Sequence, residues 1–379
     1  MAAIRLRGMT WDHRRAIDPL LAVQALFAAR HPRIPLPWAS RSPHLCEVTS
    51  VAELARDYDM IILDHPFCGD IAASKCLTPL DDVLTGEQRS VFVGPSLATY
   101  VYAGQTWAVP VDAACQVAVS RPDLMERTDS GVPTEWAAMI DLGRPAGRGR
   151  FKHGIRLKGV HSLMTFFTLC ANLGEPCATT PDQPFADLPT ARAALEHLRE
   201  LLALCPKEAL DWNSIALHDA MAARDDLLFC PAVYCYATYA EADQRRPLRF
   251  HDFPGLRGCA GSTIGGTGLG ISAHCRNPEA ALTYARFAAT SAAQAAFALN
   301  HGQAPRLDCW TDAAIDARFG GCYGSTLKTM EGCWIRPRFA GYLGFQAQAG
   351  DLIEQHLRGG IDETDLLDRL QKLFETSPR

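Results

Sequence analysis

The chain has 379 residues, of which 48% are hydrophobic and 21% are charged. This composition is typical of a folded globular protein, and the length suits two domains of roughly 100–200 residues each. The formal net charge of −5 argues against nucleic acid as a partner, because that binding usually needs a basic surface. No apolar stretch approaches the about 20 residues that a membrane span needs; polar residues interrupt the best one, 287–299.

The N-terminus and the cysteines bear on the compartment. Arg5, Arg7 and Arg14 interrupt any apolar core of a secretory signal within the first 15 residues. Fourteen cysteines are scattered from Cys46 to Cys333 without a repeated spacing. So many thiols risk mispairing in an oxidising compartment, whereas in the cytosol they act as small buried hydrophobic residues. We therefore expect a cytoplasmic protein, with a periplasmic location as the alternative if an N-terminal signal was omitted.

The first part of the chain alternates short extended runs with helical segments, which indicates an α/β architecture. Strands are expected over 4–9, 34–38 and 58–63, and the last of these is a continuous apolar run typical of a buried parallel strand. Helices are expected from Asp18-Pro19 through Phe27 and over 51–56.

The rest of the chain continues this alternation. A hairpin is expected around Tyr102–Trp107, a strand over 117–120, and a helix with Thr134 as its N-cap. Later segments are expected as follows: an exposed loop over 145–151, an amphipathic helix over 188–205, a buried strand over 227–230, a glycine-rich loop over 255–270, a helix with Asn277 as N-cap and Pro278 in its first turn, and a last helix over 363–374.

Several short motifs occur in a definite order. They are Gly8-Met9-Thr10-Trp11, Asp64-His65-Pro66, the hairpin 102–112, Arg121-Pro122-Asp123-Leu124, Val132-Pro133-Thr134-Glu135-Trp136, the turn 265–272 and the helix 279–287. This ordered set resembles the extracellular solute-binding proteins of ABC importers, in the sugar-type family that includes maltose-binding proteins. The resemblance covers nearly the whole chain.

The resemblance implies a type II periplasmic-binding-protein-like fold, in which two α/β lobes close on a ligand in the cleft between them. The first lobe is expected from residues 1–112 plus 260–310, and the second from 113–259 plus 311–379. The implied partners are a small polar solute, such as a sugar or a small organic acid, and an ABC permease if the chain is exported.

In such a fold, ligand-binding residues are expected after the first and third strands. Trp11, Asp12 and His13 follow the first strand, where Trp can stack on a sugar ring and Asp can accept hydrogen bonds from hydroxyls. Asp64, His65 and Phe67 follow the third, where the acid and the imidazole orient a ligand or act as a general base. The open alternatives are that Trp11 packs in the core and Asp12 caps a turn, and that Asp64 caps a helix or accepts a hydrogen bond at the strand end while His65 is solvated.

Further candidates come from later segments. Gly265, Gly266 and Thr267 are expected to offer backbone N–H groups, or to form a tight turn only. Asp112 is a candidate hydrogen-bond acceptor, Tyr234 a candidate ligand-contacting residue, and Arg336 a candidate carboxylate-binding residue. Six residues have weaker support, and packing or surface roles are the alternative for them: Cys115, Lys158, His161, Tyr236, Tyr239 and Arg338.

The second hypothesis is a cytoplasmic enzyme on the same fold, an isomerase, lyase or hydrolase using Asp64, His65 and His13 for acid–base chemistry. An intracellular sensor that passes ligand closure to a partner protein is the third. We expect neither a cofactor nor a metal, because no C-x-x-C, H-E-x-x-H or zinc-spaced histidine pair occurs.

Overall fold

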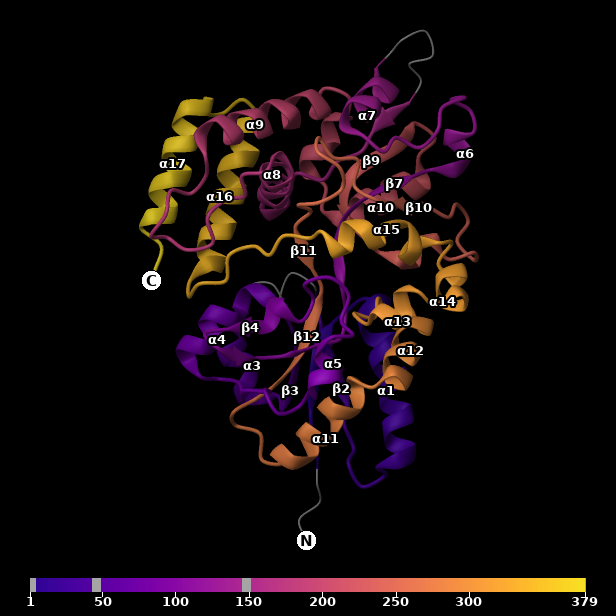
Figure 1. Cartoon of the computed structure of the whole chain (residues 1–379), viewed down its shortest axis with the longest axis vertical. Helices are drawn as coiled ribbons and strands as arrows, with labels where there is room; N and C mark the ends of the chain where they lie inside the picture. Colours follow the sequence, from indigo (N-terminus) through magenta and orange to yellow (C-terminus); the bar gives the residue numbers. More distant parts are fainter. Residues whose placement is uncertain (1–4, 43–48, 145–150, 379) are drawn as a thin grey trace. The chain divides into compact units, whose positions relative to one another are not determined.

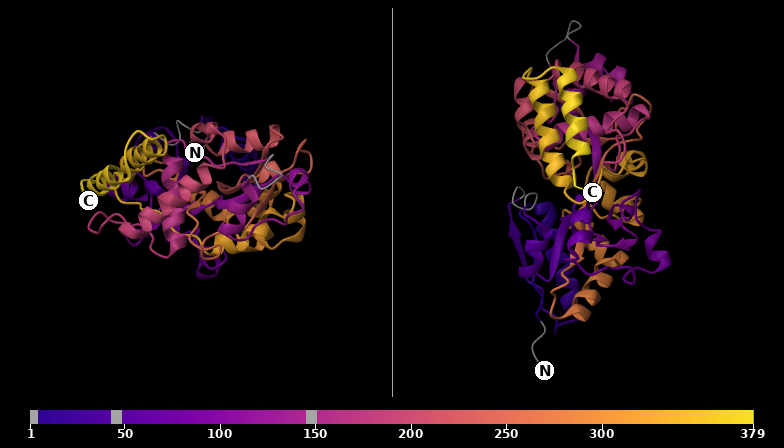
Figure 2. Two further views of the ribbon diagram at one scale, coloured as in Figure 1. Left: turned by 90° about the horizontal axis from the view of Figure 1, so that it is seen from above. Right: turned by 90° about the vertical axis from the view of Figure 1, so that its left-hand side faces the viewer.

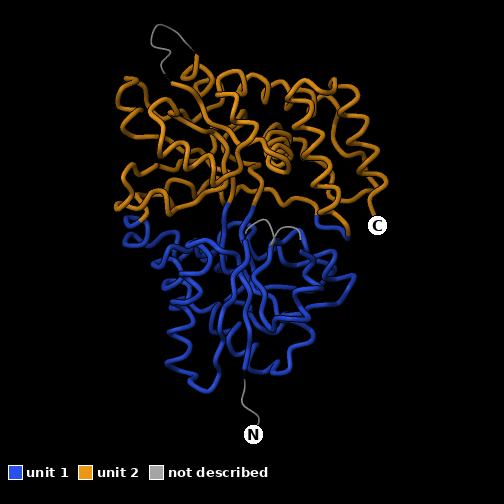
Figure 3. The backbone as a smooth tube through the Cα atoms, turned by 180° about the vertical axis from the view of Figure 1, so that it is seen from behind, with its two compact units in different colours: residues 1–114, 265–318, 338–340 blue, residues 115–264, 319–337, 341–379 orange. Residues whose placement is uncertain are grey.

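The structure is a computed structural model that describes residues 5–42, 49–144 and 151–378 (Figure 1). It divides into two compact units, each assembled from separate stretches of the chain (Figure 3). The first unit comprises residues 1–114, 265–318 and 338–340, and the second comprises residues 115–264, 319–337 and 341–379. Cys46, the start of the first expected strand and most of the expected 145–151 loop lie outside the described residues.

The first unit is built on a five-stranded mixed sheet with the strand order β2-β1-β3-β12-β6. β1, β2 and β3 run parallel, whereas β12 runs antiparallel to β3 and to β6. β3 is buried along most of its length, as its continuous apolar run predicted. The strands of this unit are β1 (Gly8–Trp11), β2 (Trp38–Arg41), β3 (Met60–Asp64), β6 (Val109–Pro110) and β12 (Thr267–Ile271), with a separate hairpin of β4 (Val101–Tyr102) and β5 (Gln105–Thr106).

Helices accompany this sheet, and α1 packs against both α11 and α12. The expected hairpin and the helices beginning near residues 51 and 278 are confirmed. The helices of the unit are α1 (Arg14–Arg30), α3 (Val51–Asp57), α4 (Cys68–Ser74), α5 (Gly86–Arg89), α11 (Pro278–Ala288), α12 (Ser291–Leu299), α13 (Leu307–Trp310) and α14 (Ala313–Arg318), and its 3-10 turns are η1 (His65–Phe67) and η2 (Ala98–Tyr100).

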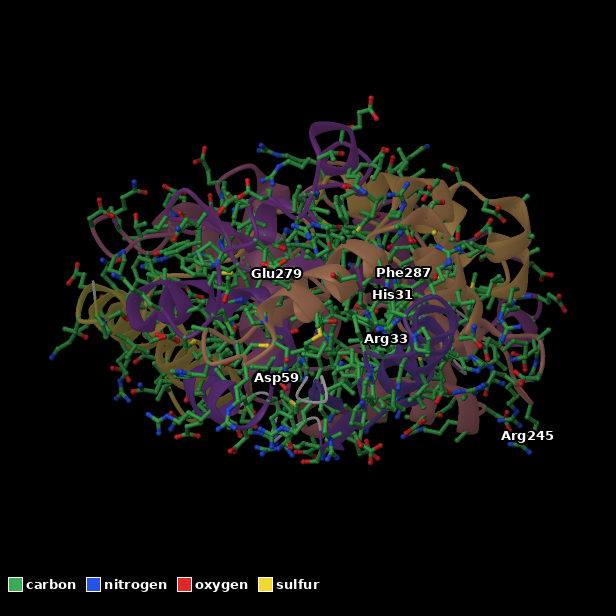
Figure 4. All side chains as sticks on the ribbon, turned by 90° about the horizontal axis from the view of Figure 1, so that it is seen from below. His31, Arg33, Asp59, Arg245, Glu279 and Phe287 are labelled. Carbon is green, nitrogen blue, oxygen red and sulfur yellow. The ribbon has the colours of Figure 1, made fainter. Side chains whose placement is uncertain are left out.

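Aromatic residues join the end of α1 to α11. The Phe27 ring lies 4.6 Å from the His31 ring and 5.4 Å from the Phe287 ring. His31 and Phe287 are labelled beside each other in Figure 4. Such contacts between rings add about 0.5–1.5 kcal/mol each beyond their buried area, so they fix α11 against the end of α1.

The start of α1 differs from the sequence expectation. The helix begins at Arg14, and its N-cap is His13, whose Nδ1 accepts a hydrogen bond from the backbone N–H of Arg15 (3.1 Å). Asp18 therefore lies inside the helix and does not cap it. Pro19 is also inside, where it removes one backbone donor near the start of the helix.

The glycine-rich segment was expected to be a loop, but its last residues, from Thr267, belong to β12, which lies inside the sheet. The reason is close packing: a Cβ on Gly268 would lie 2.8 Å from the Tyr100 ring, and one on Gly270 would lie 2.6 Å from Leu77. The glycines thus allow side chains of neighbouring elements to approach the strand.

The second unit contains a four-stranded sheet with the order β10-β7-β9-β8, and β11 pairs with β7. β7 runs antiparallel to β9 and to β10, and β8 runs parallel to β9. Every residue of β7 and all but the last of β9 are buried, so the core of the unit surrounds these two strands. The strands are β7 (Ala114–Ser120), β8 (Lys152–His153), β9 (Leu227–Tyr234), β10 (Arg249–His251) and β11 (Ile264–Gly265).

Helices pack around this second sheet, and α8 contacts both α9 and α16. α16 and α17 lie side by side in both views of Figure 2. The expected cap at Thr134 is wrong, since α7 starts at Trp136 with Glu135 as its N-cap. The helices are α6 (Pro122–Met125), α7 (Trp136–Gly143), α8 (Val160–Leu173), α9 (Leu188–Leu202), α10 (Ser214–Ala223), α15 (Cys322–Glu331), α16 (Tyr342–Leu357) and α17 (Glu363–Glu375), with 3-10 turns η3 (Lys207–Asp211) and η4 (Ala237–Ala240).

The bounds of the two units differ from those of the expected lobes. Residues 260–264 lie in the second unit, where the backbone N–H of Ile264 donates to the carbonyl of Trp334 (3.0 Å). Residues 311–318 lie in the first unit, because α14 packs against α12 and α13. Across the described ranges, no helix is both long and apolar enough to cross a lipid bilayer.

Candidate functional site

A small pocket lies in the first unit, where β1 ends and α1 begins. The space between its lining side chains is about 200 Å³, open solvent included. Three of its lining residues, Trp11, Asp112 and Thr267, were expected ligand contacts. The lining consists of Thr10, Trp11, Arg15, Ala16, Leu20, Ile62, Val111, Asp112, Thr267 and Phe297.

A buried ion pair forms part of this pocket. The Asp112 carboxylate accepts from Arg15 at two points, Nε to Oδ2 at 3.0 Å and Nη2 to Oδ1 at 2.5 Å. Both side chains are only 4% exposed. The pair neutralises two charges that would be costly to bury separately, and it places a polar surface in an otherwise apolar pocket. The sequence did not reveal Arg15, because nothing in it links a helix start to a residue 97 positions away.

The three residues after β1 have different environments. Trp11 is half-buried and lines the pocket, and its ring stacks on that of His13 at 5.4 Å. His13 caps α1 as described above, while Asp12 is exposed and its backbone N–H donates to the carbonyl of Arg41 (2.6 Å). Trp11 is therefore the residue of this group best placed to contact a solute.

The residues after β3 are more buried than the sequence suggested. Asp64 is half-buried at the end of β3, opposite Thr267 in the sheet. His65 and Phe67 are 0% and 5% exposed, and the His65 ring meets Tyr100 edge-on at 6.3 Å. Neither His65 nor Phe67 lines the pocket. In this structure His65 and Phe67 are therefore core residues of the first unit, whereas Asp64 and His13 are only half-buried.

The Gly265–Thr267 turn is held in place by hydrogen bonds to Asp112 and Tyr100. Gly266 has φ +103°, and a Cβ there would lie 2.4 Å from the carbonyl oxygen of Asp112, so only glycine fits. Its carbonyl accepts from the Tyr100 hydroxyl (3.1 Å). The backbone N–H of Thr267 donates to the Asp112 carbonyl (3.1 Å) and is therefore occupied within the unit.

In the second unit, Tyr234 lies beside a buried arginine, Arg156, that the sequence analysis missed. Tyr234 is half-buried at the end of β9, and the Arg156 guanidinium lies 5.0 Å from its ring centre. Arg156 is fully buried; its Nε donates to the Ser214 hydroxyl (2.9 Å) and its Nη1 to the Thr165 hydroxyl (3.2 Å). Within the described ranges, its Nη2 has no hydrogen-bond partner and no carboxylate forms an ion pair with it.

Other cationic groups lie near Arg156. The pKa of His161 is lowered well below its ordinary value. Burial is the largest cause, and the positive charges of Arg156, Arg336 and Lys158 lower it further. Arg336 is 8% exposed and its Nη1 donates to the Gln346 side-chain oxygen (2.8 Å), whereas Lys158 is exposed. We call Arg156, Lys158 and Arg336 the cationic cluster; the lowered pKa leaves the neighbouring His161 uncharged at neutral pH.

Two carboxylates border the cationic cluster at Gly159: Asp351, whose Oδ1 would lie 3.7 Å from a Cβ on that glycine, and Glu354. Glu354 Oε2 accepts from the backbone N–H of Gly159 (2.5 Å), and its other oxygen is bound by Arg358. Its charge is therefore shared with an arginine outside the cluster.

The remaining candidates have structural roles. Arg338 belongs to the first unit, where its Nη1 donates to the carbonyls of Ala98, Thr99 and Val101 at 2.6–3.0 Å. Arg336 and Arg338 thus belong to different units. Two further tyrosines, Tyr236 and Tyr239, pack on His218, and Cys115 is buried in β7. No group of three metal-ligating side chains is found in the part of the chain that the structure describes.

The two discontinuous units, each with helices around a mixed sheet, define a periplasmic-binding-protein-like α/β fold. The sequence model of the bacterial extracellular solute-binding protein family matches residues 48–308, more than half of the chain. The chain therefore belongs to this family. A family of extracellular proteins gives no support to the cytoplasmic location expected from the cysteines.

Solved structures show the same fold. Maltose-bound MalE3 of T. maritima has a TM-score of 0.82 at 18% identity, covering 98% of this chain and 99% of that one. A ribitol-bound ABC transporter solute-binding protein of Agrobacterium radiobacter K84 has a TM-score of 0.78 at 17% identity, covering 98% of both chains. UgpB of Mycobacterium tuberculosis, in complex with glycerophosphocholine, has a TM-score of 0.77 at 18% identity, covering 98% and 97%. No curated protein matches the sequence.

Proposed function

We propose that this chain binds a small polar solute as the solute-binding protein of an ABC importer and acts outside the cytoplasm. In this proposal the solute is held in an interlobe cleft with hinge closure, the mode that the family resemblance implies. The observation that carries the proposal is the pocket of the first unit, where the half-buried Trp11 ring lies beside the Arg15–Asp112 pair. An aromatic face next to a polar surface suits the alternating apolar and hydroxyl faces of a sugar or polyol.

The cationic cluster of the second unit favours a solute that also bears an acidic group. A fully buried guanidinium without a carboxylate partner is costly, and an anionic group of the solute would supply the missing charge. The similar proteins named above were solved with maltose, ribitol and glycerophosphocholine. Of these, the phosphodiester is the one that carries an anion. We therefore propose a sugar acid, a sugar phosphate or a related polyol ester as the solute class.

Pairs of matched compounds test this class. The melting temperature of the protein is recorded with gluconate against sorbitol, and with glycerol 3-phosphate against glycerol, at equal ionic strength. We expect the acidic member of at least one pair to raise the melting temperature, because a ligand that binds only the folded state stabilises it. The effect should disappear in Arg156→Gln while remaining in Arg369→Gln, which changes an exposed arginine of α17 outside the cluster. Stabilisation by neutral sugars alone would contradict the acidic class and leave solute binding standing.

The permease and the compartment are tested in the source cells. We expect the protein in the extracytoplasmic fraction, and we expect it to stimulate ATP hydrolysis by a cognate permease only when its solute is present. Recovery of the chain in the cytosolic fraction alone would contradict the transport role.

A further inference from the structure

Two cysteines of the second unit lie unusually close together. The sulfurs of Cys235 and Cys322 are 3.2 Å apart, and the two residues are 4% and 3% exposed. Cys235 directly follows Tyr234 at the end of β9, and Cys322 is the first residue of α15. They are 87 positions apart in the chain, so the approach is a product of the fold and not of local sequence.

The backbone around this pair is well fixed. The N–H of Cys235 donates to the carbonyl of Cys115 on β7 (3.2 Å), which extends the pairing of β7 with β9 by one residue. The N–H of Cys322 donates to the carbonyl of Phe319 (3.2 Å) at the turn before α15. A disulfide has an S–S distance of about 2.05 Å, so the two sulfurs would have to approach by about 1.1 Å to bond.

We infer that Cys235 and Cys322 form a disulfide when the chain folds in an oxidising compartment. Their two thiols together lose two electrons and two protons. The oxidant is a disulfide, such as glutathione disulfide or the disulfide of an oxidoreductase. One cysteine thiolate attacks the oxidant to give a mixed disulfide, the second thiolate displaces the sulfur of the oxidant, and the oxidant leaves as two thiols.

Buried thiols that lie close together can also bind a metal ion. The structure does not favour that role for Cys235 and Cys322. Cys115 lies near Cys235, and burial followed by a hydrogen bond with Cys333 raises the pKa of the Cys115 thiol well above its ordinary value. Even so, no three of these side chains meet the geometry of a metal site within the described residues. Cys115 and Cys333 are the alternative partners that the test must distinguish, since Cys115 interacts with both Cys235 and Cys333.

The disulfide would restrict the motion of the part of the second unit that contains the candidate binding residues Tyr234 and Arg336. It would tie segment 319–337, which contains Arg336, to the end of β9 next to Tyr234. Because both sulfurs are buried, the bond would form while the unit is still folding and would then resist exchange with outside thiols. This inference does not depend on which solute the protein binds.

Refolding of the whole purified chain tests the inference. The protein is reduced and unfolded in guanidinium, then refolded in a mixture of reduced and oxidised glutathione, alkylated without reduction, and digested for peptide mass mapping. We expect a cross-linked peptide pair joining Cys235 to Cys322 and the loss of two hydrogens from the intact mass. Because mapping is done on the unmodified sequence, the result does not depend on a variant that fails to fold.

Variants then test the consequence. Breaking a bond across so long a loop should lower the melting temperature by about 5–10 °C when the wild-type protein is reduced. Cys235→Ala and Cys322→Ala should lose this sensitivity to reductant, whereas Cys230→Ala, which removes another buried thiol from β9, should keep it. Alkylation of both Cys235 and Cys322 in the refolded, unreduced protein would overturn the inference, as would a map in which Cys115 is the partner of either.

Discussion

The guanidinium of Arg15 and the carboxylate of Asp112 form a two-point ion pair in the pocket of the first unit, although they are 97 positions apart in the chain. Arg15 lies in the first turn of α1, and Asp112 follows β6, so the pair ties a helix start to the edge of the sheet. This pair is both a structural cross-connection and the most polar part of the pocket.

Removing one member of the pair should destabilise the protein strongly. Arg15→Met leaves the Asp112 carboxylate buried without its partner, and we expect a loss of about 3–5 kcal/mol in the free energy of unfolding. The double variant Arg15→Met with Asp112→Leu should recover most of that loss, because no charge remains buried. Urea denaturation of the three proteins measures both effects. A loss below about 1 kcal/mol in the single variant would mean that water reaches the carboxylate.

Gly266 should be intolerant of any side chain. Gly266→Ala would place a Cβ 2.4 Å from the Asp112 carbonyl oxygen at φ +103°, and we expect it to cost more than about 2 kcal/mol in stability. Gly104→Ala is the matched control, because Gly104 also has a positive φ (+77°) but open space around it, so its cost should be near 1 kcal/mol. Equal costs in thermal or urea denaturation would show that the close contact with Asp112 relaxes freely.

Trp11 should contribute directly to solute affinity. We expect Trp11→Ala to weaken binding about 10- to 100-fold, since a stacking aromatic side chain contributes on the order of 1–3 kcal/mol. Trp212→Ala is the control, because Trp212 is also half-buried but belongs to the second unit, near Arg224. Titration calorimetry of both variants with the solute identified for the wild type checks this. Equal losses in the two variants would argue against a role for Trp11 in the site.

His153 should make the protein less stable in mild acid. It is buried beside the carbonyl of Met139, and burial lowers its pKa to about 4 from 6.5. The unfolded chain therefore takes up a proton as the pH falls below about 6.5, while the folded chain does not until about pH 4, so stability is lost across that window. Between pH 7 and pH 5 the expected contribution is about 2 kcal/mol.

Urea denaturation of the wild type and of His153→Gln at the two pH values isolates this effect. The variant should be less stable at pH 7 but should lose about 2 kcal/mol less than the wild type on going to pH 5. An identical pH dependence in the two proteins would show that His153 titrates normally.

The predictions made from the sequence were most accurate where local pattern and packing agree. The apolar run before Asp64 is the parallel strand β3, and the periodic leucines after Asp187 form α9. β12 was missed because glycines such as Gly268 and Gly270 usually indicate a loop. Here they lie in a strand because Tyr100 and Leu77, which are distant in the sequence, pack closely against it. The ordered motifs indicated the family even where single elements were misplaced.

The site residues were harder to predict than the fold. Trp11 lines the pocket, and its predicted contact with a ligand stays a prediction, whereas His65 lies in the core and His13 caps a helix. Arg156 was missed because it stands alone between Ile155 and Leu157, and its burial depends on Ser214 and Thr165 in distant helices. The burial of a side chain and its contacts with residues distant in the sequence depend on tertiary packing. The spacing of residues along the chain does not predict them.

The central claim is that this chain binds a small polar solute and releases it unchanged. The most direct measurement is a proton NMR time course of the protein with pooled sugars, polyols, sugar acids and sugar phosphates, recording saturation transfer together with signal intensity. We expect saturation transfer to one compound or one narrow class, with constant signal intensities over hours. New resonances that grow in proportion to the protein concentration would contradict it, since they would show that the protein converts its ligand.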